Sequence, residues 1–377
     1  MKKFLSLMLV IMIPMVIQAV QVEIDGIQYE VVKKAKIAEV KGINKEYSGE
    51  IIIPASIIYE DVTCDVISIN DLAFYKCSSL TSVNIPNSVK SIGRWAFSGC
   101  SALTSANIPE GVTSIERESF KDCSSLTSIN IPNSVKSIEQ GAFSGCSSLS
   151  SINIPNSVTS IGYFAFSDCE SLTSITIPNS VTSIEQSEFS GCSNLTSINI
   201  PNSVKSIEYN AFSSCSNLTS INIPNSVKSI GERAFLGCSS LTSINIPNSI
   251  TDIEKYTFGN CTSLESVVIG EGVNYISQSA FHGAKKIKSI TLGSKVSCIS
   301  NDNFFNCEDL EVVTCKALSV PTISPGTGDD FLSAFSNCHI EYAKLIVPDK
   351  AIEAYKKVYP WNMFGTIEGL SGSKGGK

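Results

Sequence analysis

The sequence has very little of the residues on which most catalytic sites depend. Only two of its 377 residues are histidine, His282 and His339, and neither lies beside a candidate nucleophile. The chain also lacks G-x-S-x-G, H-E-x-x-H and a phosphate-binding glycine loop. These absences argue against an enzyme, and the sequence offers no catalytic residue and no cofactor-binding residue.

Charge and cysteine spacing exclude two further kinds of site. Lys and Arg total 28 against 35 Asp and Glu, a formal net charge of -7, so we expect no basic surface for nucleic acid. The 14 cysteines include no C-x-x-C pair, and most lie 23 residues apart, which does not favour four ligands converging on one ion. We therefore expect no metal site.

What the chain has in abundance is a repeat of 23 residues. Each repeat carries the spacing L-x-x-I-x-I, and a period in the twenties with this spacing is typical of a leucine-rich-repeat solenoid. We predict a parallel sheet with one strand per turn, short extended, helical or 3₁₀ segments on the other side, and a cap at each end. One cysteine marks each repeat, with Ala284 in the same position before the last: Cys77, Cys100, Cys123, Cys146, Cys169, Cys192, Cys215, Cys238, Cys261 and Cys307.

One repeat shows how the turn is built. Leu218, Ile221 and Ile223 direct their side chains to one side of a short strand, and Pro224 ends that strand because it cannot donate a hydrogen bond. A second extended segment follows, and then a single helical or 3₁₀ turn that carries Phe235. The same position holds a phenylalanine in every repeat, which predicts a buried column: Phe74, Phe97, Phe120, Phe143, Phe166, Phe189, Phe212, Phe235, Phe258, Phe281 and Phe304.

The two ends depart from the repeat. Residues 1–19 have two lysines, an apolar run and a small-residue end, which indicates a secretory signal peptide. A membrane anchor is the alternative, but the run is short for a span and no stop-transfer segment follows. We divide the rest into an amino-terminal cap (20–71), leucine-rich repeats (72–316), an irregular last turn with a carboxy-terminal cap (317–370) and a disordered tail (371–377).

The caps have their own signals. A hairpin is predicted around Asp25-Gly26 and a second turn at Tyr47 to Glu50. At the other end, a strand ending at Val347 precedes a helical segment from Asp349 to Val358, and the aromatic residues after it should close the open end of the array.

The cysteine column has two interpretations. Cysteines in an exported chain often form disulfides, and strands about 4.8 Å apart bring equivalent Cα atoms within range. However, nine uninterrupted cysteines cannot all pair with a neighbour, and Ala284 replaces one without disturbing the period. A ladder of buried free thiols is therefore the favoured interpretation.

The consensus L-T-S-I-N-I-P-N-S-V-K-S-I-x-x-x-A-F-x-G-C-S-S resembles the BspA-like branch of bacterial leucine-rich-repeat proteins. The opening Val22 to Tyr29, the Ser48-Gly49 turn and the closing Val347-Pro348 to Trp361 region are also similar to the caps of that family. The resemblance implies a secreted or surface-displayed adhesion protein. Because the apolar run of residues 1–19 is short for a span, we expect no membrane insertion of the mature chain. Host matrix or plasma glycoproteins, or other bacteria, are the partners that it implies.

Comparison of the repeats with one another shows which positions are free to vary. The exposed strand position is almost always asparagine, flanked by Thr and Ser, and this uniform polar face favours carbohydrate as the alternative ligand, with Asn153, Asn199 and Asn222 as its candidate residues. The two adjacent positions that directly precede each Ala-Phe pair vary instead. They hold residue types that anchor protein interfaces, although an unconstrained surface would vary too. The candidate protein-binding residues are Trp95, Tyr163, Phe164, Tyr209 and Tyr256.

Overall fold

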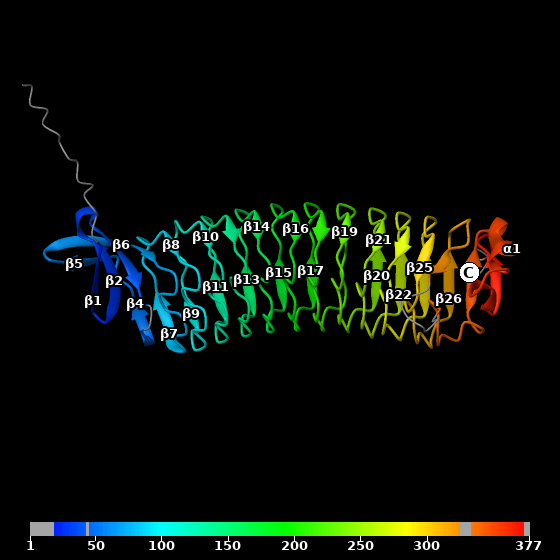
Figure 1. The fold of residues 1–377 in the computed structure, drawn as a ribbon, viewed down its shortest axis with the longest axis horizontal. Helices are drawn as coiled ribbons and strands as arrows, with labels where there is room; N and C mark the ends of the chain where they lie inside the picture. The colour runs from blue at the N-terminus through cyan, green and yellow to red at the C-terminus, as the bar shows by residue number, and fades with distance from the viewer. Residues whose placement is uncertain (1–18, 43–44, 325–332, 373–377) are drawn as a thin grey trace, which may run out of the picture.

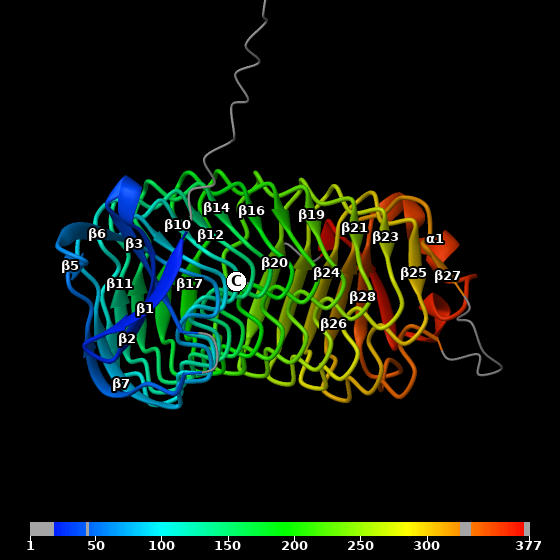
Figure 2. The same cartoon turned by 60° about the vertical axis from the view of Figure 1, so that its left-hand side comes forward.

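The chain folds into an elongated solenoid, and this confirms the predicted leucine-rich-repeat architecture (Figure 1). The structure is a computed structural model that describes residues 19–42, 45–324 and 333–372. The predicted signal peptide lies outside the described residues except for Ala19, and so does most of the predicted carboxy-terminal tail. Figure 2 shows the turns as stacked coils from the amino-terminal to the carboxy-terminal cap.

The front of the solenoid takes one parallel strand from almost every turn. Equivalent residues of successive repeats pair, as Ser128 pairs with Ser151, so the register shifts by one repeat per strand. The front strands are β4 (Ser48–Ile52), β7 (Ser79–Asn84), β9 (Ser105–Ala106), β11 (Ser128–Asn130), β13 (Ser151–Asn153), β15 (Ser174–Thr176), β17 (Ser197–Asn199), β20 (Ser243–Ile246), β22 (Ser266–Ile269), β24 (Ser289–Leu292), β26 (Val312–Cys315), β28 (Lys344–Val347) and β29 (Thr366–Gly369).

After the Pro-Asn-Ser corner, each turn contributes a second, shorter strand to the back of the solenoid. This segment is short because only Val158 to Gly162 lie between the corner and the next turn of that repeat, and the Ile161 side chain points into the core. The back strands are β8 (Ser91–Ile92), β10 (Ser114–Ile115), β12 (Ser137–Ile138), β14 (Ser160–Ile161), β16 (Ser183–Ile184), β18 (Ser206–Ile207), β19 (Ser229–Ile230), β21 (Asp252–Ile253), β23 (Tyr275–Ile276), β25 (Cys298–Ser300) and β27 (Thr322–Ser324).

The third side of each turn, which we call the turn side, carries the phenylalanine. We expected a helical or 3₁₀ turn here, and that expectation is wrong. The segment around Phe235 is a run of turns closed by bonds such as Leu236 N–H to Arg233 C=O (3.1 Å) and Cys238 N–H to Phe235 C=O (3.2 Å). Arg233 and Gly237 have φ of 60° and 75°, and a helix cannot accommodate two left-handed residues so close together.

The phenylalanine column is confirmed as the centre of the core. Every ring from Phe74 to Phe335 is almost fully buried and stacks on the next, with centroids 5.0 to 5.8 Å apart. Because no single turn could enclose its own ring, burial of the column couples each turn to its neighbours. Burying one such side chain stabilises the fold by about 1.5–3 kcal/mol.

The cysteine column packs beside the rings, and all 14 thiols are free in the structure. From Cys100 to Cys261, each repeat thiol donates to the carbonyl of a phenylalanine 26 residues earlier, as Cys146 Sγ does to Phe120 O (3.2 Å). Burial raises the pKa of Cys146 to about 12, so this thiol is neutral at physiological pH. These thiols act as small apolar residues with a weak hydrogen bond.

The amino-terminal cap is a sheet that merges into the solenoid. The predicted hairpin is confirmed, since β1 (Val20–Ile24) and β2 (Ile27–Val32) are antiparallel, and β3 (Ile37–Lys41), β5 (Ser56–Tyr59) and β6 (Val62–Ile69) complete the sheet, with a 3₁₀ helix η1 (Lys33–Ala35) before β3. The second turn predicted at Tyr47 to Glu50 is wrong. Ser48 begins strand β4, which pairs with β7, because its alternating pattern already belongs to the front sheet.

The carboxy-terminal cap covers the last ring of the column. After β28 come η2 (Asp349–Ala351), helix α1 (Ile352–Tyr355), η3 (Trp361–Met363) and β29. Trp361 and Phe364 meet the ring of Phe335 edge-on at 5.6 Å, and the Trp361 indole N–H donates to Pro321 O (2.9 Å). Within the described residues, no helix has the length and apolar character needed to cross a bilayer.

Candidate functional site

The two residues before each Ala-Phe pair form one edge of the solenoid, which we call the variable corner. The second residue of each pair is left-handed, with φ between 52° and 62°. Its N–H donates to the carbonyl of the first residue of the next pair, for example Gly141 to Tyr163 (2.8 Å). The backbone is therefore constant while the side chains vary. The pairs are Arg94–Trp95, Arg117–Glu118, Gln140–Gly141, Tyr163–Phe164, Gln186–Ser187, Tyr209–Asn210, Glu232–Arg233 and Lys255–Tyr256.

The structure places all five candidate protein-binding residues on this corner. Trp95, Phe164 and Tyr256 occupy the left-handed position, and Tyr163 and Tyr209 occupy the position before it. Tyr163 is the most accessible, with 51% of its surface exposed, and the other four are half-buried. In the described structure, no ring contact joins Trp95 or Tyr163 to the aromatic residues further along the corner.

Trp95 lies between two arginines. The guanidinium of Arg117 is 5.5 Å and that of Arg94 is 5.8 Å from its ring, within the range of a cation–π interaction. Glu118 also contacts this group. Partial burial raises the pKa of its carboxyl, but hydrogen bonds from Lys121 and Trp95 outweigh that effect and hold the pKa below its ordinary value. Trp95 is thus a fixed ring surrounded by charge.

A longer cluster follows from Tyr209, and we call it the aromatic ladder. Arg233 lies between two tyrosine rings, 5.9 Å from Tyr209 and 5.7 Å from Tyr256, and its Nη1 donates to the Tyr209 hydroxyl (2.7 Å). Tyr256 meets His282 edge-on at 6.4 Å, and His282 stacks on Phe305 at 5.9 Å. The ladder therefore extends over consecutive turns.

Sequence reasoning missed the last two members of the aromatic ladder. Judged by its sequence neighbours alone, His282 has no candidate nucleophile beside it, and Phe305 lies outside the repeated phenylalanine column. Both directly follow the column phenylalanine of their repeat, so they are one repeat apart and had to stack. Alignment of the divergent late repeats would have revealed this signal.

The polar strand face offers a second, chemically different surface. Asn153, Asn199 and Asn222 are exposed, and the described structure gives their side-chain amides no hydrogen-bond partner. The threonine hydroxyls beside them are already engaged, because Thr196 donates to Thr173 O (3.3 Å) and Thr219 to Thr196 O (3.4 Å). A ligand on this face would therefore meet free amides and occupied hydroxyls.

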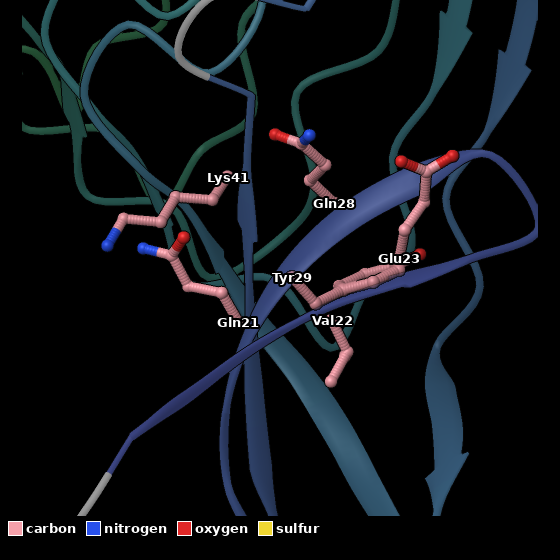
Figure 3. Close-up of a pocket in the computed structure, with 6 residues that line it drawn as sticks. All are labelled: Gln21, Val22, Glu23, Gln28, Tyr29 and Lys41. Atoms are coloured by element: carbon pink, nitrogen blue, oxygen red, sulfur yellow. The ribbon is translucent and has the colours of Figure 1, made fainter.

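The amino-terminal cap contains a hollow of about 250 Å³ between β1, β2 and β3 (Figure 3). Gln21 and Lys41 border it on one side and Glu23 and Gln28 on another, above the buried ring of Tyr29. Its charged groups are already paired, Lys41 with Glu30 and Glu23 with Lys45. In the described part of the chain there is also no cluster of His, Cys, Asp or Glu that could hold a metal. The two charged groups that line the hollow both have partners of opposite charge.

Several solved structures are similar to this chain. A leucine-rich-repeat protein from Bacteroides ovatus is 30% identical, with 92% of this chain and 98% of that chain covered and a TM-score of 0.62. A leucine-rich cell surface protein from Faecalibacterium prausnitzii is 28% identical, covering 84% and 98% (TM-score 0.47). The pneumococcal vaccine antigen PcpA is 20% identical, covering 93% and 98% (TM-score 0.50), which shows the fold alone. No curated protein matches the sequence.

The repeats themselves match a described family. The BspA type leucine rich repeat region, in six copies, matches residues 67–196 and 182–311, which together make up more than half of the chain. The resemblance inferred from the repeat consensus is thereby confirmed. With its buried phenylalanine column and its 23-residue turns, the chain belongs to the BspA-type leucine-rich-repeat family.

Proposed function

We propose that the protein is an exported, surface-displayed scaffold that adheres to host or bacterial proteins through its variable corner. Family membership supports a protein-interaction scaffold, since repeat solenoids present extended binding surfaces. One observation carries the assignment to the corner. Its backbone is held by the same hydrogen bond in turn after turn, while its side chains differ and include a half-exposed tyrosine, Tyr163.

The chemistry of the corner suits contact with a protein. Aromatic and arginine side chains contribute most to interface energy, and the corner carries both, whereas the strand face carries neither. Its residues recur at the spacing of the turns, so one elongated partner could touch several of them. Several modest contacts then act at high effective concentration and give useful avidity without a deep pocket.

Export is supported by the apolar residues that precede the amino-terminal cap. Residues 1–19 have the charged start, apolar run and small-residue end of a signal peptide. A host matrix or plasma glycoprotein is then an accessible partner, and so is a protein on another bacterium.

A carbohydrate-binding exported protein is the second candidate function. The observation that favours it is the set of exposed amides of Asn153, Asn199 and Asn222 on the front face, which have no hydrogen-bond partner in the described structure. Amides of this kind can donate to and accept from sugar hydroxyls. The face has no aromatic ring to stack on a sugar, so protein binding remains the first proposal.

The test begins with a binding screen of the mature chain against matrix proteins, plasma glycoproteins and glycans. The decisive variant combines Tyr163→Gln, Phe164→Ser and Tyr209→Gln. Gln and Ser already occupy these two positions at Gln186 and Ser187, where Ser187 has a φ of 52°, so the substitutions should fit the backbone. We expect at least about a tenfold loss of affinity for a protein partner, because two or more anchors are removed.

Two controls separate the hypotheses. Tyr342→Gln removes a tyrosine that is 85% exposed and outside the corner, and it should leave binding unchanged. Replacement of Asn153, Asn199 and Asn222 by Ala should abolish glycan binding but not protein binding. Full affinity in the triple corner variant, with an unchanged melting temperature, would overturn the proposed surface.

A further inference from the structure

The solenoid is interrupted on both its front and its back at two interfaces between turns. At the first, β13 does not pair with β15, nor β14 with β16; at the second, β19 does not pair with β21, and the front bridge at Asn222 does not continue to β20. At every other interface of the described array, at least one face keeps its pairing. The two interfaces are three repeats apart. The first lies between the turns that carry Ile161 and Ile184, and the second between those that carry Ile230 and Ile253.

A glycine precedes each interface. The same repeat position is glycine at Gly93, and after it the back pair β8–β10 is missing while β7 still pairs with β9. Gly162 and Gly231 occupy a position that holds Glu in most other repeats, and they let the turn approach its predecessor closely. A Cβ at Gly162 would lie 2.6 Å from Gln140 N, and one at Gly231 would lie 2.7 Å from Tyr209 N. The bond to the preceding turn is kept at both glycines, from Gly162 N–H to Ile138 O and from Gly231 N–H to Ile207 O, each 2.8 Å. The next interface is the one that loses its pairing.

The lost hydrogen bonds can be identified by comparison with the neighbouring repeat. Glu208 N–H donates to Ile184 O (2.9 Å), but at the first interface Glu185 N–H does not reach the equivalent carbonyl of Ile161. It donates to the carboxyl of Glu188 instead, at 2.8 Å. At the second interface Thr257, in the repeat position of Glu188, donates its hydroxyl to Glu254 O (2.8 Å). Polar side chains thus replace the column's usual alanine where the back sheet is open.

The turn side, in contrast, is continuous across both interfaces. Phe164 N–H donates to Gln186 O (3.0 Å) at the first, and Arg233 N–H donates to Lys255 O (3.0 Å) at the second. The phenylalanine rings also stay stacked across them, at 5.8 and 5.2 Å. On the front, only a long hydrogen bond remains beside each missing strand pair, from Thr173 N–H to Ser150 O (3.5 Å) and from Thr242 N–H to Thr219 O (3.4 Å).

From these observations we infer that the two interfaces are joints about which the solenoid bends. The turn side with its variable corner is the hinge line. The Pro-Asn-Ser corner, which lies between the two open sheets, is the side that opens. Serine hydroxyls cross the joints there and must release on opening, Ser180 Oγ from Val158 O and Ser249 Oγ from Val227 O. The array then moves as three blocks, the middle one made of three turns. Bending of this kind adapts the length of the molecule to a partner while the corner stays intact.

The joints can be tested with pairs of nitroxide labels on the corner that should open. Asn156 and Asn202 span the first joint, Asn202 and Asn248 span the second, and Asn179 and Asn225 span none. All are exposed asparagines, and each pair is two turns apart, roughly 10 Å, a separation that dipolar broadening resolves. The labels are introduced as Asn→Cys in a Cys298→Ser background, since Cys298 is the one partly exposed native thiol.

We expect the distance distribution of both spanning pairs to be at least about twofold broader than that of the control pair. A joint-closing variant adds a second measurement. Glu188→Ala restores the usual alanine at the first joint and should narrow the Asn156–Asn202 distribution while leaving Asn202–Asn248 unchanged. Equal widths for the three pairs, in variants with an unchanged melting temperature, would overturn the inference. Because no partner is present, this result does not depend on what the corner binds.

Discussion

At the scale of single residues, the most unusual group is Glu188. It occupies a position that holds alanine in most repeats, its side chain is fully buried, and only one carboxyl oxygen has a hydrogen-bond partner. Burial raises the pKa of this carboxyl well above its ordinary value, although the hydrogen bond from the Glu185 backbone amide acts in the opposite direction. A carboxyl kept protonated in this way accepts the Glu185 amide without carrying a buried charge.

The raised pKa predicts how stability depends on pH. The folded state binds the proton more tightly than the unfolded state, so the group's contribution is most favourable below the unfolded pKa, about 4.3, and is lost as pH rises above it. Glu188→Ala should therefore raise the melting temperature at pH 8, and the gain should shrink toward pH 4. Glu208→Ala, which removes a half-exposed carboxylate, is the control in the same thermal melts. An equal gain at both pH values would contradict the prediction.

At the scale of the repeated element, each turn contains two left-handed residues. The second of them, just before the repeat cysteine, alternates along the array between glycine and a polar residue. A Cβ at Gly145 would lie 2.3 Å from Asp122 Oδ1, and one at Gly191 would lie 2.3 Å from Asp168 Oδ1. The polar side chain at this position in one turn thus lies over the glycine of the next turn and leaves no room for a Cβ there. This packing explains the alternation.

This geometry makes Ser214 a site for stabilisation. Its φ is 62°, its side chain is exposed, and the described structure gives its hydroxyl no hydrogen-bond partner. Ser214→Gly should raise the free energy of unfolding by up to about 1 kcal/mol, because glycine adopts this conformation without steric cost. Ser220→Gly, at an exposed position of the front face outside the left-handed region, should lower it by roughly 0.5–1 kcal/mol. Denaturant unfolding of the two variants measures both effects.

At the scale of the whole molecule, the array depends on its closed ends. A stack of identical turns would expose an apolar ring and unpaired strand edges at its last turn. Trp361 prevents this because it is fully buried, meets Phe335 edge-on and donates to Pro321 O. The amino-terminal cap does the same at the other end, where the ring centroids of Tyr47 and Phe74 are 4.9 Å apart.

Removal of the carboxy-terminal closure should destabilise the last turns first. Trp361→Ala should cost about 3–5 kcal/mol, as expected for loss of a large buried aromatic side chain. Amide hydrogen exchange should then accelerate in β26 and β28 more than in the central repeats. Tyr342→Ala is the control, because that ring is 85% exposed. Uniform acceleration along the array would mean that the solenoid unfolds as one unit.

Much of this protein was determined by its sequence alone. The 23-residue period, the inward spacing of Leu218, Ile221 and Ile223, and the phenylalanine column were enough to predict the solenoid, because each repeat can bury its apolar side chains only against identical neighbours. Internal comparison also identified the variable corner, since a position that packing does not restrict is free to differ between repeats.

Tertiary structure decided the features that depend on distances between turns. The left-handed residues around Phe235 replaced the expected helical turn, because the chain must reverse within a few residues while its amides bond to the next turn. Likewise, the Arg233 sandwich between Tyr209 and Tyr256 joins residues of three successive repeats. The gaps in strand pairing near Glu188 and Thr257 also depend on how each turn stacks on the one before it. These contacts depend on the distances between stacked turns. The sequence of a single repeat does not specify those distances.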